Sequence, residues 1–328
     1  MKKIIGIIIS ACCYINLAAQ NGKDLFTTIF PIGNTSFTIE SSMKNQISYS
    51  RYDNHTSITK IENKTLEASE FHNSKRHVFT VKYLNFNDST ITENNGESRT
   101  TTINTDKKDP TFIDKMYQLP INKTFNLYIR ETGEGYASLN ADKLTNGAEK
   151  FIPASITKGL ANLYLKSLDY TFNENAGFRL IEGAMVMPHE YNWKEEKIQD
   201  TVNKKTESIY ITTLHSVCGL KADFEVKYKI KKVTKEKYTL IGTGCGVQHF
   251  NEEKVTLWIG EGKMFGVSPK DISVNVEIEV DRMTGLVSKA IYKTSYHHTS
   301  NEETSPGKPN DLVYDVIWNC ENTVSSKK

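Results

Sequence analysis

The sequence lacks the residue spacings that mark common metal and nucleotide sites. No CxxC or CxxH pair is present, and His189-Glu190 has no second histidine to complete an HExxH motif. Glycines alternate with other residues over 242–246, but neither GxGxxG nor Walker spacing occurs. We therefore predict no metal and no cofactor. Alternating glycines in a strand instead indicate a bend, or backbone packed tightly against a neighbour.

The chain also has little net charge and no long apolar run after residue 19. The chain has 41 Lys and Arg residues and 39 Asp and Glu residues. If Lys2 and Lys3 are removed with an N-terminal signal, the number of basic residues falls to 39 and equals the number of acidic ones. A chain near zero net charge has no overall electrostatic affinity for nucleic acid or anionic lipid. We predict no nucleic-acid partner and, after signal removal, no membrane span.

The N-terminus has the features of an export signal. Lys2 and Lys3 precede the apolar stretch 4–9, and small residues follow it. This pattern predicts a signal peptide over 1–19, cleaved between Ala19 and Gln20. Residues 9–12 also match a lipobox, which would place a lipid on Cys12 instead. The predicted location is the periplasm or cell envelope, or the exterior of the cell, and lipidation would make the chain an outer-membrane lipoprotein.

Cysteine is scarce once that signal is removed. Cys12 and Cys13 leave with it, so that Cys218, Cys245 and Cys320 remain. Three thiols in an oxidising compartment permit one disulfide. Cys218 and Cys245 both lie in predicted strand regions, and we favour that pair.

Strict alternation of apolar and polar residues dominates the rest of the chain. It is clearest over 224–230 and 272–280, and the second stretch runs through Asp281 and Gly285 into 286–292 as a hairpin. Strands with one polar face are typical of antiparallel sheets. Further strands are predicted at 35–49, 76–85, 98–104, 123–131, 135–139, 208–215, 237–242, 254–259 and 312–318.

One amphipathic helix interrupts this pattern. Apolar residues recur at helical spacing between Pro153 and Phe172, and Ser155 is the predicted N-cap. The fold class is therefore mainly β, a long, curved, half-barrel-like antiparallel sheet with one central helix covering it. The predicted organisation is a signal over 1–19, β-rich parts over 20–145 and 175–322, the helix over 150–173, and a disordered tail over 323–328.

Ser155 and Lys158 form the one catalytic motif in the sequence. Ser-x-x-Lys places a hydroxyl and an amine one helical turn apart, and the segment resembles the nucleophile motif of penicillin-binding proteins and serine β-lactamases. Residues 273–275 and 293–295 are nominal matches to that family's other two motifs. However, Ser295 replaces a glycine, 273–275 lies within a strand, and the chain has no sequence for the family's helical lobe.

The overall layout resembles a family of exported Bacteroidetes proteins described as a domain of unknown function. The likeness rests on the signal, long early strands such as 36–49, the helix followed by Pro188 and Trp193, and the hairpin with Asp281-x-x-Thr-Gly285. The family brings no catalytic residues to carry over. Long strands with a covering helix also resemble the half-barrel of LolA-type periplasmic lipoprotein carriers, which is a likeness of fold.

Two hypotheses follow for the function. The leading one is a non-enzymatic envelope protein that binds a lipid or another apolar ligand, or an envelope protein partner, on its curved sheet. The alternative is a serine acyl-transfer enzyme that uses Ser155 and Lys158. Aromatic residues such as Trp193, Trp258 and Trp318 suit either a core or an apolar groove.

Overall fold

The computed structural model describes most of the chain after residue 34. The described residues are 35–51, 54–73, 76–130, 136–184, 194–199, 206–215, 217–220, 222–247, 255–258, 264–282, 284–303 and 311–327. The predicted signal peptide, with Cys12, Ala19 and Gln20, lies outside them. So do Pro188 and Trp193.

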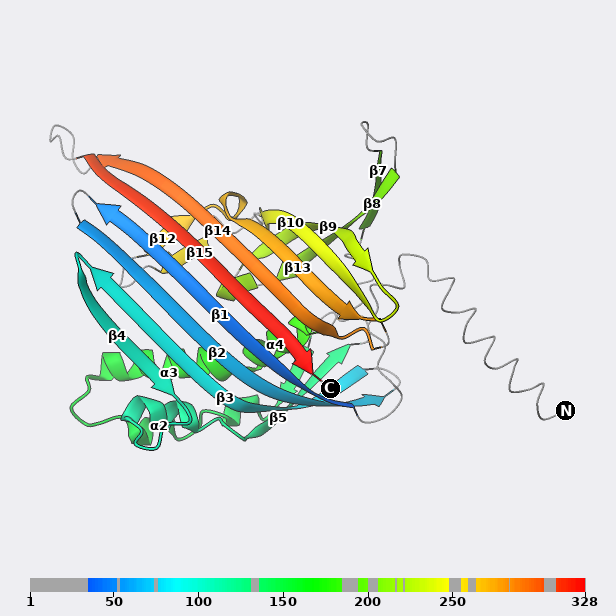
Figure 1. The fold of residues 1–328 in the computed structure, drawn as a ribbon. Helices are drawn as coiled ribbons and strands as arrows, with labels where there is room; N and C mark the ends of the chain where they lie inside the picture. Colours follow the sequence, from blue (N-terminus) through cyan, green and yellow to red (C-terminus); the bar gives the residue numbers. More distant parts are fainter. Residues whose placement is uncertain are drawn as a thin grey trace.

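The fold is one long, curved antiparallel sheet, which confirms the predicted fold class (Figure 1). Its 13 strands follow the order β6-β5-β3-β2-β1-β15-β14-β13-β10-β9-β8-β7, with β4 paired to β3, and β11 and β12 form a separate hairpin. The strands are β1 (Thr35–Arg51), β2 (Asn54–Asn73), β3 (Arg76–Asn94), β4 (Glu97–Asn104), β5 (Thr124–Arg130), β6 (Tyr136–Leu139), β7 (Lys194–Gln199), β8 (Thr206–His215), β9 (Asp223–Val233), β10 (Lys237–Val247), β11 (Val255–Trp258), β12 (Met264–Val267), β13 (Ser273–Asp281), β14 (Val287–Glu303) and β15 (Asp311–Lys327).

Pairing of β1 with β15 joins the two predicted β-rich parts into that one sheet. The register runs from Thr38 opposite Lys327 to Arg51 opposite Tyr314. Residues 323–327 are therefore part of a strand, and the prediction of a disordered tail over 323–328 is wrong for them. The alternating hydrogen bonds to β1 hold this polar segment in place.

The helices lie on the concave side of the sheet (Figure 1). Within the described residues, three α-helices and four short 3-10 turns are present where one helix was predicted. They are α2 (Phe112–Gln118), α3 (Lys158–Phe172), α4 (Glu174–Gly183), η2 (Ala141–Lys143), η3 (Ala148–Phe151), η4 (Val217–Gly219) and η5 (Pro269–Asp271).

The helix predicted over 150–173 begins later than expected. Its N-cap is Thr157, whose Oγ1 accepts a hydrogen bond from the amide of Leu160, so the prediction of Ser155 as N-cap is wrong. Residues 153–156 form a turn instead, with the amide of Ile156 donating to the carbonyl of Pro153. At the other end, Asn173 stops α3 and its side chain accepts from the amide of Ala176, which starts α4.

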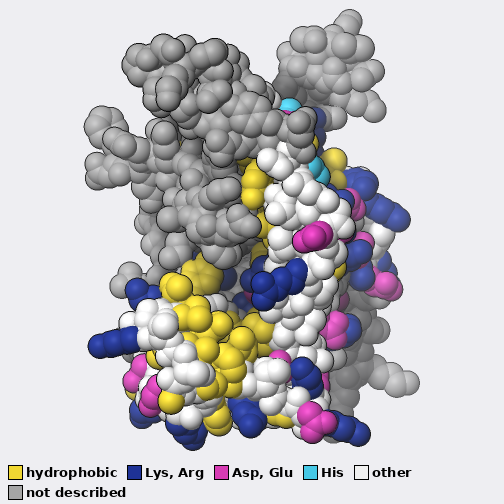
Figure 2. All heavy atoms as spheres, turned by 90° about the vertical axis from the view of Figure 1, so that its left-hand side faces the viewer, with side chains coloured by type: hydrophobic (Ala, Val, Ile, Leu, Met, Phe, Trp, Pro, Cys, Tyr) yellow, Lys and Arg dark blue, Asp and Glu magenta, His cyan; other side chains and the backbone are white. Residues whose placement is uncertain are grey.

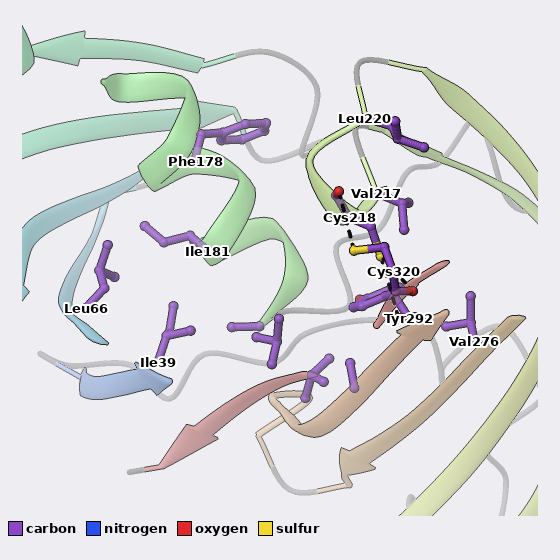
Figure 3. Packing of buried hydrophobic residues seen from close by; sticks show 14 of the residues in the cluster. Ile39, Leu66, Phe178, Ile181, Val217, Cys218, Leu220, Val276, Tyr292 and Cys320 are labelled. Carbon is purple, nitrogen blue, oxygen red and sulfur yellow. Dashed lines mark hydrogen bonds between the residues drawn. The ribbon is translucent and has the colours of Figure 1, made fainter. Parts of the chain in front are cut away.

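The core lies between the concave face and the helices. Side chains alternate along each strand, so every second residue of β13, such as Val274 and Val276, is buried while its neighbours are exposed or partly exposed. Helix residues Leu168, Phe172 and Ile181 are fully buried in the same core. Figure 3 shows Ile181 of α4 there, with Ile39 and Leu66 of the sheet. We call this concave, helix-covered side the inner face and the opposite side the outer face.

Two glycine predictions are confirmed. The hairpin between β13 and β14 turns at Gly285, whose φ of 69° favours glycine, while Asp281 accepts hydrogen bonds from Thr284. The glycines of β10 pack against neighbouring backbone. A Cβ placed on Gly244 would lie 1.9 Å from the carbonyl oxygen of Glu225, and one on Gly246 would lie 2.2 Å from that of Pro269.

Substitution Gly244→Ala should therefore destabilise the sheet, by roughly 1–3 kcal/mol, because β9 or β10 must shift to admit the methyl group. Chemical denaturation would measure this change in the free energy of unfolding. Gly159→Ala is the matched control: no atom lies within 4 Å of the added carbon, and the site is helical. Its expected effect is neutral or slightly stabilising. Equal effects of the two substitutions would contradict the packing argument.

Candidate functional site

The middle of the inner face carries charged side chains. Lys60, Glu62 and Lys64 alternate along β2 on the same face as the buried Leu66, and Asp88 lies opposite Glu62 on β3. We call Lys60, Glu62, Lys64 and Asp88 the ion cluster.

The ion cluster is a continuous chain of salt bridges. Lys60 Nζ lies 3.1 Å from Glu62 Oε2 and 3.0 Å from Asp88 Oδ2, and Lys64 Nζ lies 2.8 Å from Glu62 Oε1. The Lys64 ammonium also sits 5.7 Å from the centre of the Phe86 ring. Two cations and two carboxylates balance each other, so the ion cluster as a whole is neutral although it is polar.

These contacts shift the pKa values of the cluster. Burial alone would raise the pKa of Glu62, but the ammonium groups of Lys64 and Lys60 outweigh it and lower that pKa to about 2. Burial would lower the pKa of Lys60, and the carboxylates of Glu62 and Asp88 outweigh it and raise that pKa. Both groups are therefore charged throughout the neutral range.

Helix α3 presents an apolar stripe beside this cluster. Leu160, Leu163, Ser167 and Tyr170 follow one another at intervals of three or four residues, so they share one side of the helix. The Leu160 residue is 40% exposed and Leu163 is 64% exposed. We call these four residues the α3 stripe. It differs from the face of α3 that is buried in the core, which includes Leu168 and Phe172.

Two tyrosines connect the α3 stripe to the ion cluster. The Tyr117 hydroxyl on α2 lies 3.0 Å from Ser167 Oγ. Burial raises the pKa of Tyr117. The Lys60 charge lowers this pKa slightly and the Asp88 charge raises it. Burial likewise raises the pKa of Tyr170, with a further contribution from the Glu62 carboxylate. The part of the α3 stripe that holds Ser167 and Tyr170 therefore lies within electrostatic reach of the ion cluster.

Part of this region is accessible to solvent. The Lys60 side chain is 40% exposed although it lies on the inner face, whereas the Glu62 side chain is 13% exposed. Strand β1 contributes Ser41, Met43 and Asn45, which are only partly buried. Figure 2 shows hydrophobic side chains exposed over the helical layer, on its side next to the strands. The candidate site is thus an accessible surface with an apolar wall and a polar, charge-balanced floor.

The predicted catalytic motif does not come together. Ser155 and Lys158 are exposed at the start of α3, on the inner side of the sheet. Val276 pairs with Tyr292, whose side chain points toward α4, so the adjacent Asn275 and Lys293 point to the outer face. Lys293 makes a salt bridge of 3.1 Å with Glu321 there. The sheet therefore separates the two halves of the proposed acyl-transfer site.

The structure also does not bring Cys218 and Cys245 together. Cys245 is exposed on the outer face of β10, while Cys218 is buried on the inner side in η4. The cysteine next to Cys218 is Cys320 of β15, and each thiol lies 3.7 Å from the carbonyl oxygen of the other residue.

No group of three or more His, Cys, Asp or Glu side chains in the described ranges is placed to hold a metal ion. His297 pairs instead with Asp315, at 2.7 Å from Nε2 to Oδ1, and the His298 ring stacks on Tyr296. Among the helices of the described residues, none combines the length and apolar character needed to cross a bilayer.

Comparison with known proteins gives limited matches. No family model and no curated protein matches the chain, so the predicted membership of an exported Bacteroidetes family is not shown. Among solved structures, one of lipid–protein interactions in lipovitellin matches with a TM-score of 0.43 and 8% identity, over 91% of this chain. The chain spans only 25% of the length of that protein.

Two structures from Pseudomonas aeruginosa also match. OccK7 (OpdD) gives a TM-score of 0.21 at 6% identity, over 90% of this chain and 99% of that one. OccK5 (OpdH) gives a TM-score of 0.19 at 6% identity, over 89% of this chain and 98% of that one.

Loss of the Glu62 charge should change how stability depends on pH. In the folded chain the pKa of Glu62 is lowered from 4.5 to about 2. The contribution of Glu62 to the free energy of unfolding is therefore complete above pH 4.5 and is lost as pH falls toward 2. Glu62→Gln should destabilise the chain at pH 7 by roughly 2–3 kcal/mol. Urea denaturation should show this difference shrinking by more than half at pH 3.

Glu67→Gln is the control for that experiment. Glu67 is also on β2 and pairs with a lysine, Lys82, but both side chains are about a third exposed, at 36% and 32%. Exposed pairs contribute less than about 1 kcal/mol. A Glu67→Gln effect as large and as pH-dependent as that of Glu62→Gln would contradict the assignment.

Proposed function

We propose that this chain is a non-enzymatic binding protein that holds an apolar ligand between the α3 stripe and the inner face of β1–β3. The observation that carries the proposal is the exposure of Leu160 and Leu163 on the same side of α3 as Tyr170, whose pKa is influenced by the charges of Glu62 and Lys60. Apolar surface left in contact with water favours association at roughly 25 cal/mol per Å². A bound hydrocarbon would remove these leucines from water.

The charged side chains of the ion cluster favour a ligand that has a polar group as well as a hydrocarbon chain. Met43 on β1 lies opposite Glu62 and gives the floor one apolar side chain, whereas the ion cluster offers hydrogen-bonding groups beside it. A ligand with a hydrocarbon chain and a polar end would place the chain along Leu160, Leu163 and Met43. Its polar end would meet the partly exposed Lys60.

The proposed setting is the cell envelope. The motivation is the cationic head and apolar stretch of residues 1–19, which predict export. N-terminal sequencing of the chain made in a Gram-negative host should give Gln20 as the first residue. A blocked N-terminus with incorporated fatty acid would assign lipidation at Cys12 instead, and an intact Met1 would contradict export.

Removing the apolar wall should weaken ligand binding. The double substitution Leu160→Ser and Leu163→Ser should lower the affinity for a fluorescent fatty acid at least tenfold, because both side chains would contact its hydrocarbon. Fluorescence titration in detergent-free buffer measures this. Ile317→Ser is the matched control. Ile317 is 40% exposed, like Leu160, but lies on the outer face of β15. The affinity of this variant for the fatty acid should therefore be unchanged. Equal losses in both variants would contradict the proposed site.

Native extraction gives an independent test. Chain purified without detergent should release an apolar compound that organic extraction and mass spectrometry detect, and the Leu160/Leu163 variant should carry less of it. A chain free of any co-purifying apolar compound, and unable to bind the fluorescent fatty acid, would rule out the ligand function and leave a protein partner for the same surface.

A further inference from the structure

The described part of the chain contains two buried cysteines that face each other. Cys218 is 4% exposed in η4, the turn between β8 and β9, and Cys320 is 2% exposed on β15. Their thiols donate to each other's carbonyl oxygens at 3.7 Å, and Cys218 Sγ also lies 3.6 Å from the carbonyl oxygen of Tyr292 (Figure 3). Residues 102 positions apart in sequence are thereby in direct contact.

The backbone at Cys218 is unusual. Its φ of 54° and ψ of 34° place a residue other than glycine in the left-handed region, which L-residues rarely occupy. Such a conformation persists only where its surroundings fix it, and it is often part of a function. Here it directs the thiol inward, toward β15, and away from the exposed Cys245.

We infer that Cys218 and Cys320 form a disulfide when the chain folds in an oxidising compartment. The two thiols lose their S–H bonds and one S–S bond forms. Two electrons and two protons pass to a disulfide-bearing oxidant, such as oxidised glutathione or a protein disulfide, which becomes two thiols. Because both cysteines are buried in the folded chain, the exchange takes place during folding, before the core closes.

A bond at this place would fix the curvature of the sheet. Strands β10, β13 and β14 separate β9 from β15 in the sheet order, yet η4 reaches across the inner face to β14 and β15. The disulfide would join the turn between β8 and β9, near one end of the strand order, to β15 in its middle. Cross-links that close long loops restrict the unfolded chain most strongly.

The test is to refold the full chain with a mixture of reduced and oxidised glutathione and to map peptides without reduction. The expected product is one cross-linked species containing Cys218 and Cys320, lighter by two hydrogens than the separate peptides, with Cys245 alkylated. A Cys245→Ser variant should keep the cross-link, and Cys320→Ser should lose it. The oxidised chain should melt on the order of 10 °C above the reduced chain.

Alkylation of both Cys218 and Cys320 in the unreduced digest would overturn the inference. So would a cross-link that joins either of them to Cys245, Cys12 or Cys13. The peptide map of the unaltered chain decides the question even if a serine variant fails to fold. None of these outcomes depends on ligand binding, so they test the disulfide separately from the proposed function.

Discussion

Pairing of β1 with β15 is the constraint on which the rest of the structure depends. It brings strands from the two ends of the described chain into one sheet, with a continuous register from Thr38–Lys327 to Arg51–Tyr314. Without it, β2 and β3 would have no connection to β13 and β14. The inner face would then be two separate surfaces, and the helices would have no concave surface to cover. Long-range pairing of this kind is formed only after a large loop has closed.

The inner face combines two environments that usually exclude each other. Its ends are apolar and fully buried, with residues such as Ile39 and Trp318, while its middle holds the ion cluster. Buried charges are tolerated when each finds a partner, and Lys60, Glu62 and Asp88 do so. The exposed leucines lie on the same side of α3 as Tyr170, which is influenced by the Glu62 charge. The proposed ligand, with a hydrocarbon chain and a polar end, would use both kinds of surface.

Much of the sheet was predictable because its strands alternate clearly, as in β9, β13 and β14. Strand β2 was missed. Its central residues Lys60, Glu62 and Lys64 are charged on the inner face, while Ile61 lies on the outer face, so the usual sign of a half-buried strand is reversed. The strand that carries the ion cluster is therefore among those that periodicity did not find, together with β7 and β12.

By itself, the sequence determined the antiparallel β class, the turn at Gly285 and the close packing of the β10 glycines, because these depend on neighbouring residues and on local backbone geometry. Only the tertiary structure decided which distant groups meet. It placed Cys218 against Cys320, set Asn275 and Lys293 on the opposite face from Ser155, and brought α3 beside the ion cluster. Such contacts follow from strand order and sheet curvature, which no local pattern encodes.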